Sequence, residues 1–242
     1  MKISRRNFVG SAAASAGGLC LFGKSGLNAG VLCVDQPFAG ESRDSHCVIL
    51  DPQAECALRE SLIGYQAALG SSAICLSDTA SRQLRNCRTV VVPGLGILKS
   101  ETALLLLDLL EAGAQVLLDS GAGFLSAKEF LAHQEMLERF FKVEVEARVD
   151  VWQGTEAIPY VHYEWPCEIM VRDFRWAIPV YGKRGEVIGT VKELPVALKK
   201  RVANGELVFL GSPLGPALRA GDLQAQAWLH SLAAAWSDFQ AI

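Results

Sequence analysis

The sequence predicts an α/β fold built on a doubly wound, mostly parallel sheet. A β-branched apolar run at Thr89–Val92 stops at a Pro-Gly pair, and a helical pattern follows at Glu101–Ala112. A second apolar run at Gln115–Leu118 then ends in Asp119–Gly123. Strand, helix and strand in this order are typical of a βαβ unit, which joins two parallel strands. Such sheets bind ligands beyond the carboxyl ends of their strands, so Gly94–Gly96 and Asp119–Gly123 mark the candidate site.

The residues before this unit predict a strand, a helix and a second strand. Cys47–Leu50 is a short apolar run that ends at an Asp-Pro pair. Ala54–Leu69 places its apolar residues on one helical face, and Ala73–Leu76 is the second short apolar run. With the βαβ unit, these elements make four strands of the sheet.

The residues after the unit predict a helix, antiparallel strands and a closing strand and helix. Ser126 is a suitable N-cap for a helix over Ala127–Phe141, and Glu129 completes a capping box. Two of the later strands are joined by the Gly182–Gly185 turn and are interpreted as an antiparallel excursion from one α/β domain. The later elements are a half-exposed strand at Val143–Val151, an irregular aromatic segment at Trp152–Pro166, strands at Ile169–Tyr181 and Glu186–Val191, a short helix at Leu194–Ala203, a buried strand at Gly205–Gly211 and an amphipathic helix at Gly221–Ala235.

The N-terminus is interpreted as an export signal. Arg5-Arg6 is followed by Phe8 and then by a weakly apolar stretch of Ala, Gly, Ser and Leu, which resembles a twin-arginine signal peptide. Leu27-Asn28-Ala29 offers a cleavage site. We therefore expect residues 1–29 to be removed on export by the twin-arginine translocase, which places the protein in the periplasm or outside the cell. Residues 30–45 are then an extended lead-in, and residues 46–242 form the α/β domain.

Composition excludes several classes of partner and cofactor. Removal of residues 1–29 takes away four of the 23 basic residues and none of the 26 acidic ones, which leaves a net charge of −7. No basic patch remains to suggest binding to nucleic acid or to an anionic membrane. Six of the seven cysteines remain, without a CxxC motif or a Cys/His cluster of metal-binding spacing. We therefore expect no metal and no cofactor.

In the order of these signals, the chain resembles the class I glutamine amidotransferase-like superfamily, which has a flavodoxin-like three-layer fold. The resemblance covers roughly residues 46–236. It rests on VVVPG at the third strand exit, the helix that ends at Gly113, the glycine turn after the fourth strand and the late strand with its glycine. The nucleophile elbow of the family reads small-x-Cys-x-Gly, whereas residues 118–123 contain no cysteine. The late His-Pro-Glu of the family falls on Ser212-Pro213-Leu214, which keeps only the proline.

The resemblance therefore implies a degenerate, non-catalytic member. Members without the catalytic residues are similar to trehalose-utilisation-type domains and to accessory domains of some glycosidases, whose role is ligand binding or assembly. The flavodoxin-like strand order 2-1-3-4-5 also makes the first and third strands parallel neighbours. Cys47 opens the first strand and Cys87 lies two residues before the third, so this order predicts that the two cysteines are neighbours, with Cys56 beyond the opposite end of the first strand.

Four polar residues are candidates for catalysis, and each has a structural alternative. Asp119 ends a predicted strand, where a carboxylate can act as an acid or base, cap the turn or pair with an arginine. Ser120 is a candidate nucleophile, but Leu118 is too large for a tight elbow, and a hydroxyl that caps the turn is the alternative. If the segment is extended, His162 and Glu164 lie on the same face, where Glu164 could orient His162 as a base. They could equally belong to an aromatic surface that stacks on a sugar or partner, or simply pack in the fold.

Functions from different classes are consistent with these residues. The first is an exported, non-catalytic module that binds a small molecule, a sugar or an exported protein partner. The second is an atypical hydrolase that uses Asp119 and Ser120 with His162 and Glu164, which requires His162 or Glu164 within hydrogen-bond reach of Ser120 or Asp119. A third is a passenger or accessory of an exported redox complex. The ligand-binding residues expected for the first function lie at the strand exits: Asp51, Gly94, Gly96, Asp119, Ser120, Gly121 and Ser212.

Overall fold

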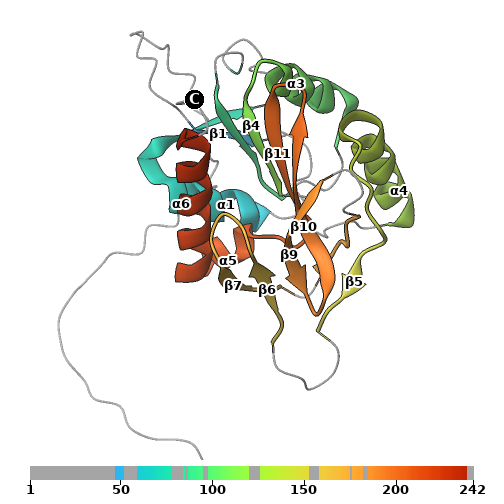
Figure 1. Ribbon diagram of the computed structural model, residues 1–242, viewed down its shortest axis with the longest axis vertical. Helices are drawn as coiled ribbons and strands as arrows, with labels where there is room; N and C mark the ends of the chain where they lie inside the picture. Colours follow the sequence, from blue (N-terminus) through green and yellow to red (C-terminus); the bar gives the residue numbers. More distant parts are fainter. Residues whose placement is uncertain are drawn as a thin grey trace, which may run out of the picture. The chain divides into compact units, whose positions relative to one another are not determined.

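The computed structural model describes residues 47–51, 59–77, 84, 87–94, 98–119, 126–152, 158–174, 176–181 and 185–238. All of them belong to one compact unit, Asp35–Ile242. Among these residues, nine strands form one sheet (Figure 1). From one edge to the other they are β2 (Ala73–Ser77), β1 (Cys47–Asp51), β3 (Thr89–Val92), β4 (Gln115–Asp119), β11 (Gly205–Leu210), β10 (Leu194–Val202), β9 (Glu186–Val191), β6 (Tyr160–Tyr163) and β7 (Ile169–Arg172).

The sheet has a parallel half and an antiparallel half. Strands β2, β1, β3, β4 and β11 pair in parallel, as the alternation of strands and helices predicts. From β11 to β7 every pairing is antiparallel. A separate pair, β5 (Val149–Asp150) with β8 (Trp176–Ala177), is also antiparallel. The α/β fold class that the sequence predicts is confirmed.

Helices cover both faces of the sheet (Figure 1). Successive strand residues point to opposite faces, so the continuous apolar runs of the parallel strands supply two cores at once. Val90 and Val116 pack with α3 (Ser100–Glu111), while Val91 and Leu117 pack with α1 (Arg59–Leu69), α5 (Gly215–Arg219) and α6 (Leu223–Asp238). None of the helices in the described ranges combines the length and the apolar character needed to cross a bilayer.

The helix after β4 begins as its sequence predicts. The Ser126 hydroxyl accepts a hydrogen bond from the amide of Glu129, whose carboxylate accepts one from the amide of Ser126. This capping box satisfies amides that the first turn leaves without helical partners. Helix α4 (Ala127–Met136) then continues into a π-helical turn, η2 (Leu137–Phe141).

The predicted helix at Leu194–Ala203 is wrong, because these residues form strand β10. Strands β9, β10 and β11 are joined by two-residue turns at Lys192-Glu193 and Ala203-Asn204. Lys192, Glu193 and Ala203 have φ values of 47°, 67° and 51°, the left-handed conformation that tight hairpins use. Pairing with β9 and β11 on both sides satisfies the backbone of β10 and overrides the helix-favouring Ala, Leu and Lys in its sequence. The segment Trp152–Pro166, predicted to be irregular, likewise contains strand β6.

Cys47 and Cys87 lie near one another, as predicted. Strands β1 and β3 are parallel neighbours with Cys47 opposite Thr89, and Cys87 precedes Thr89 by two residues. Burial and, secondarily, the Cys87 thiol raise the pKa of Cys47 to about 12, and burial raises the pKa of Cys87 to about 11. Both thiols therefore stay protonated at neutral pH and are weak nucleophiles.

Candidate functional site

Asp119 is the last residue of β4, and its side chain has no exposed surface. The hydroxyl of Tyr65, on α1, donates a hydrogen bond of 3.1 Å to Asp119 Oδ2. The amide of Gly215, at the start of α5, donates one of 3.2 Å to the same oxygen. One carboxylate oxygen thus ties a strand of the sheet to two helices.

Burial dominates the electrostatics of Asp119. It raises the pKa of the Asp119 carboxyl to about 7, although hydrogen bonds from Gly215, Tyr65 and Leu214 lower it in part. The pKa of Tyr65 is well above its ordinary value, first through burial and then through the nearby Asp119 carboxylate. A carboxyl with a pKa near neutrality suits acid–base catalysis. Asp119 Oδ1, however, is buried, has no hydrogen-bond partner among the described residues, and has no exposed surface through which to reach a substrate.

Helices α1 and α5 approach closely beside Asp119. A β-carbon built on Gly64 of α1 would lie 2.1 Å from the carbonyl oxygen of Gly215, which leaves no space for a side chain. A β-carbon on Gly215 would lie 2.2 Å from Cα of Ser61. Tyr65 follows Ser61 by one turn of α1, so both residues face the same side. The two glycines therefore allow the helix contact that brings Tyr65 and the Gly215 amide to Asp119.

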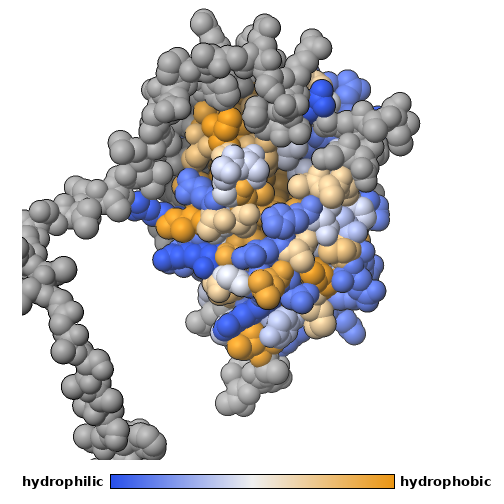
Figure 2. All heavy atoms as spheres, turned by 90° about the vertical axis from the view of Figure 1, so that its left-hand side faces the viewer, coloured by the Kyte–Doolittle hydropathy of each residue, from blue (hydrophilic) through white to orange (hydrophobic). Residues whose placement is uncertain are grey.

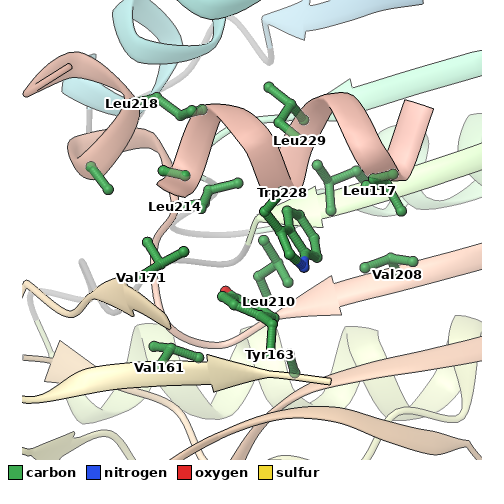
Figure 3. Packing of buried hydrophobic residues seen from close by; sticks show 14 of the residues in the cluster. Leu117, Val161, Tyr163, Val171, Val208, Leu210, Leu214, Leu218, Trp228 and Leu229 are labelled. Carbon is green, nitrogen blue, oxygen red and sulfur yellow. The ribbon is translucent and has the colours of Figure 1, made fainter. Parts of the chain in front are cut away.

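A second buried carboxylate belongs to Asp173, which follows β7. The hydroxyl of Ser212, two residues after β11, donates a hydrogen bond of 2.6 Å to Asp173 Oδ2. Both side chains are buried. Burial first, then the carboxylates of Asp119 and Asp173, raises the pKa of Tyr163. The Tyr163 ring packs against Trp228 at 4.6 Å between centroids (Figure 3).

The carboxyl ends of four parallel strands meet at one edge, as predicted. In register, Val92 lies opposite Leu118 and Leu210 opposite Asp119, so the exits of β3, β4 and β11 are adjacent. Gly94 is buried just beyond β3 with a φ of 55°, a conformation that favours glycine. Asp51 ends β1. The Asp51 side chain and all of Gly96, Ser120 and Gly121 lie outside what the structure describes.

His162 and Glu164 lie away from Asp119. Because neighbouring strand residues point to opposite faces, His162 of β6 points away from the side occupied by Tyr163. Its Nε2 atom lies 3.5 Å from Glu168 Oε1, and its side chain is 40% exposed. Glu164 is exposed and uses its amide to bond the carbonyl of Ile188. The structure therefore brings His162 to Glu168, and Asp119 to Tyr65 and Gly215.

Sequence reasoning missed the partners of the two buried carboxylates. Tyr65 reads as one more apolar residue on the inner face of α1, and the Ser212–Asp173 pair joins residues 39 positions apart. The polar tip of a tyrosine on an apolar helix face is the one signal that could have pointed to a buried acceptor. Among the described residues, no group of three or more His, Cys, Asp and Glu side chains is placed to hold a metal ion.

No protein-family model matches the sequence, and no curated protein matches it. Solved structures share its fold. The chain superposes on an exo-β-1,4-mannosidase from Opitutaceae bacterium strain TAV5 with a TM-score of 0.57 and 13% identity, over 78% of this chain and 35% of that one. A β-galactosidase from Rahnella sp. R3 gives a TM-score of 0.57 and 9% identity, over 80% of this chain and 31% of the β-galactosidase. A cytoplasmic protein from Salmonella typhimurium LT2 gives a TM-score of 0.52 and 13% identity, over 77% of this chain and 94% of the Salmonella protein.

These matches are likenesses of fold. The chain spans about a third of the length of the two glycosidases and nearly the whole of the Salmonella protein. The same arrangement of strands and helices therefore occurs both as part of a larger enzyme and as almost an entire chain.

Proposed function

We propose that the protein is an exported, non-catalytic module that binds a small molecule, a sugar or a protein partner on a flavodoxin-like, amidotransferase-like scaffold. The order β2-β1-β3-β4-β11 of the parallel strands supports the scaffold, because numbering those five strands along the chain gives 2-1-3-4-5. The burial of Asp119 is the observation on which the non-catalytic proposal depends. Its carboxylate begins the turn that bears the nucleophile in active amidotransferases, yet it bonds α1 and α5 and has no exposed surface.

The late strand supports the same proposal. Active members of the superfamily place a histidine after this strand, where it serves the nucleophile. Here Ser212 takes that place, and its hydroxyl is buried and bonded to Asp173. A buried hydroxyl–carboxylate pair stabilises the packing at the strand exit and offers no base to a nucleophile. We therefore assign Asp119 and Ser212 to structural support beneath the ligand-binding edge.

The match to part of two glycosidases favours a sugar or a protein partner. A binding module of this kind would bind its ligand at the carboxyl ends of β1, β3, β4 and β11. Near β6, Trp165 is half-buried and Lys199 Nζ lies 4.3 Å from its ring centroid, so the aromatic ring of this segment that a sugar could reach is that of Tyr160, which is 46% exposed. Aromatic faces flanked by polar groups are well suited to the apolar faces of sugars.

The purified mature protein should show no glutamine hydrolysis above that of its Asp119→Asn variant. A glutaminase needs a thiolate at the elbow, and residues 118–123 contain no cysteine. Ammonia release from glutamine measures the activity. Hydrolysis that disappears in Asp119→Asn or Ser120→Ala would contradict the non-catalytic proposal. In the same preparation, thermal melts with a panel of mono- and disaccharides test binding, since a ligand at 100 times its Kd adds about 2.7 kcal/mol of stability.

Export should remove the N-terminal residues. We expect mass spectrometry of periplasmic protein to find a new N-terminus between about residue 25 and about residue 40. Arg5→Lys combined with Arg6→Lys should block export, whereas Lys2→Arg, which keeps the twin arginines, should not. An intact Met1 on soluble exported protein, or export of the double variant at the normal level, would contradict the assignment.

A further inference from the structure

Strand β7 ends the nine-stranded sheet and leaves one strand edge without a neighbouring strand among the described residues. The amide of Asp173 donates to the carbonyl of Pro159 across the β6–β7 pair. In an antiparallel pair, residues alternate between facing the partner strand and facing away. The backbone amides and carbonyls of Ile169 and Val171 therefore face β6, as the amide of Asp173 does. The amides and carbonyls of Met170 and Arg172 point to the outer edge.

The sequence of this edge is complementary to itself. Glu168, Ile169, Met170, Val171 and Arg172 have an apolar centre, with an acid at one end and a base at the other. If a second copy of the strand pairs antiparallel about Met170, Glu168 of each copy lies opposite Arg172 of the other. The Glu168 side chain is 83% exposed and Met170 is 54% exposed.

The Arg172 guanidinium is already held in position. It lies 5.6 Å from the ring centroid of Trp152 and 5.5 Å from that of Phe174. These cation–π contacts reduce the side-chain entropy that an ion pair across the axis would cost.

Helix α6 supplies a second, independent observation. It packs beside β7, and its Trp228 shares a hydrophobic cluster with Val171 (Figure 3). Residues 223–236 of α6 contain no Asp, Glu, Lys or Arg. Exposed surface helices usually display charges, whereas the centres of protein interfaces are depleted of them. Within residues 223–236, the exposed residues are Leu223, Gln224, Ala227, His230, Ala233 and Ala234.

The exposed fraction of Leu223 is 75%. On the side of the molecule that bears α6, hydrophobic residues lie between hydrophilic ones on the described surface (Figure 2). An antiparallel strand pair is related by a two-fold axis perpendicular to the sheet. Joining two copies at β7 would therefore place both α6 helices on the same face of the extended sheet, near one another across the axis.

We propose that two copies of this chain form a symmetric dimer through β7, antiparallel and centred on Met170, with the outer faces of the two α6 helices alongside. The partner is a second copy because the acid–apolar–base order of the edge matches itself only in this register. The pairing gives hydrogen bonds to the Met170 and Arg172 backbones and covers the edge of β7, which has no strand partner among the described residues. The proposal goes beyond the proposed function and does not rest on it, since a monomer could bind the same ligand.

Sedimentation equilibrium of the mature protein tests the dimer. We expect a concentration-dependent dimer, weakened at least about tenfold by Met170→Asp, which brings two carboxylates together on the axis. Leu131→Asp is the matched control, because Leu131 on α4 is 60% exposed and lies off this surface. Glu168→Lys should also weaken the dimer, whereas Glu135→Lys on α4 should not. A monomer at all concentrations, or equal effects of Met170→Asp and Leu131→Asp, overturns the proposal.

A crosslinking variant tests the register and does not depend on a destabilising change. Residues directly opposite in a hydrogen-bonded antiparallel pair have Cα atoms about 5.5 Å apart, within the range that a disulfide spans. Met170→Cys should therefore form a covalent dimer under mild oxidation, and Leu131→Cys should not. Circular dichroism checks that both variants are folded. If folded Met170→Cys protein stays monomeric on a non-reducing gel, the β7 pairing is wrong; a dimer that survives Met170→Asp uses another surface.

Discussion

Replacing Gly215 with alanine should lower the free energy of unfolding by about 3 kcal/mol or more, or prevent folding. The new β-carbon would lie 2.2 Å from Cα and 2.5 Å from Oγ of Ser61. The first of these atoms belongs to the backbone of α1, so no side-chain rotation relieves the overlap. Helices α1 and α5 would have to separate, and the Gly215 amide would then leave the buried Asp119 carboxylate.

Gly64→Ala tests the same contact from the other helix, because its β-carbon would lie 2.1 Å from the Gly215 carbonyl oxygen. At an exposed site within a helix, Gly→Ala stabilises by roughly 1 kcal/mol, so the contact reverses the sign of the effect. Gln66→Ala, a half-buried position on α1, is the control and should change stability little. Urea denaturation monitored by circular dichroism gives the free energies. If both glycine variants matched Gln66→Ala, the helix contact would be looser than the structure has it.

The parallel half of the sheet could be predicted because its signals are local. The apolar run Thr89–Val92 coincides with β3, and the helix expected at Glu101–Ala112 is α3 to within a residue at either end. A continuous apolar run is typical of a strand that is buried on both faces, as the strands of a parallel sheet covered by helices are. The capping box at Ser126 similarly fixes the start of α4 from two residues.

The antiparallel half could not be predicted as well, because its elements are decided by pairing. The residues of β10 favour a helix locally, and the turn at Lys192-Glu193 lacks the Asn-Gly signature of tight hairpins. Only β9 and β11 on either side make this segment a strand. Local propensity is weak compared with a full set of cross-strand hydrogen bonds and buried contacts.

The candidate site shows the same limit. The sequence places Asp119 correctly at a strand exit, where the carboxyl ends converge. It does not reveal that Asp119 is buried, because the groups that bury it come from distant positions. Tyr65 is 54 residues away and Gly215 is 96 residues away. Whether a strand-end carboxylate faces a ligand or the interior depends on such long-range packing, which no spacing rule encodes.

Two buried groups should make opposing contributions to the pH dependence of stability, which variants of each can separate. The pKa of Asp119 is about 7 in the native state, against about 3.9 for an unfolded aspartate. Between these values the native state binds more protons, so this residue makes stability fall as pH rises. Burial lowers the pKa of His133 to about 3, against about 6.5 when unfolded. Between these two pKa values of His133 the unfolded state binds more protons, so His133 makes stability rise with pH. The contributions of Asp119 and His133 therefore oppose each other from about pH 4 to about pH 6.5.

Between about pH 4 and about pH 6.5, the free energy of unfolding of Asp119→Asn should therefore rise by several kcal/mol relative to that of the wild type. His133→Gln, which keeps a hydrogen-bond acceptor for the amide of Leu98, should show the opposite slope and lose stability as pH rises toward about 7. Above pH 7 the wild type holds a buried Asp119 carboxylate charge, so from about pH 4 to above pH 7 its stability relative to Asp119→Asn should fall by on the order of 4 kcal/mol. Urea denaturation across this pH range measures all three proteins. Parallel profiles for wild type and Asp119→Asn would show that Asp119 titrates as an ordinary exposed carboxylate, contrary to its place between β4, α1 and α5.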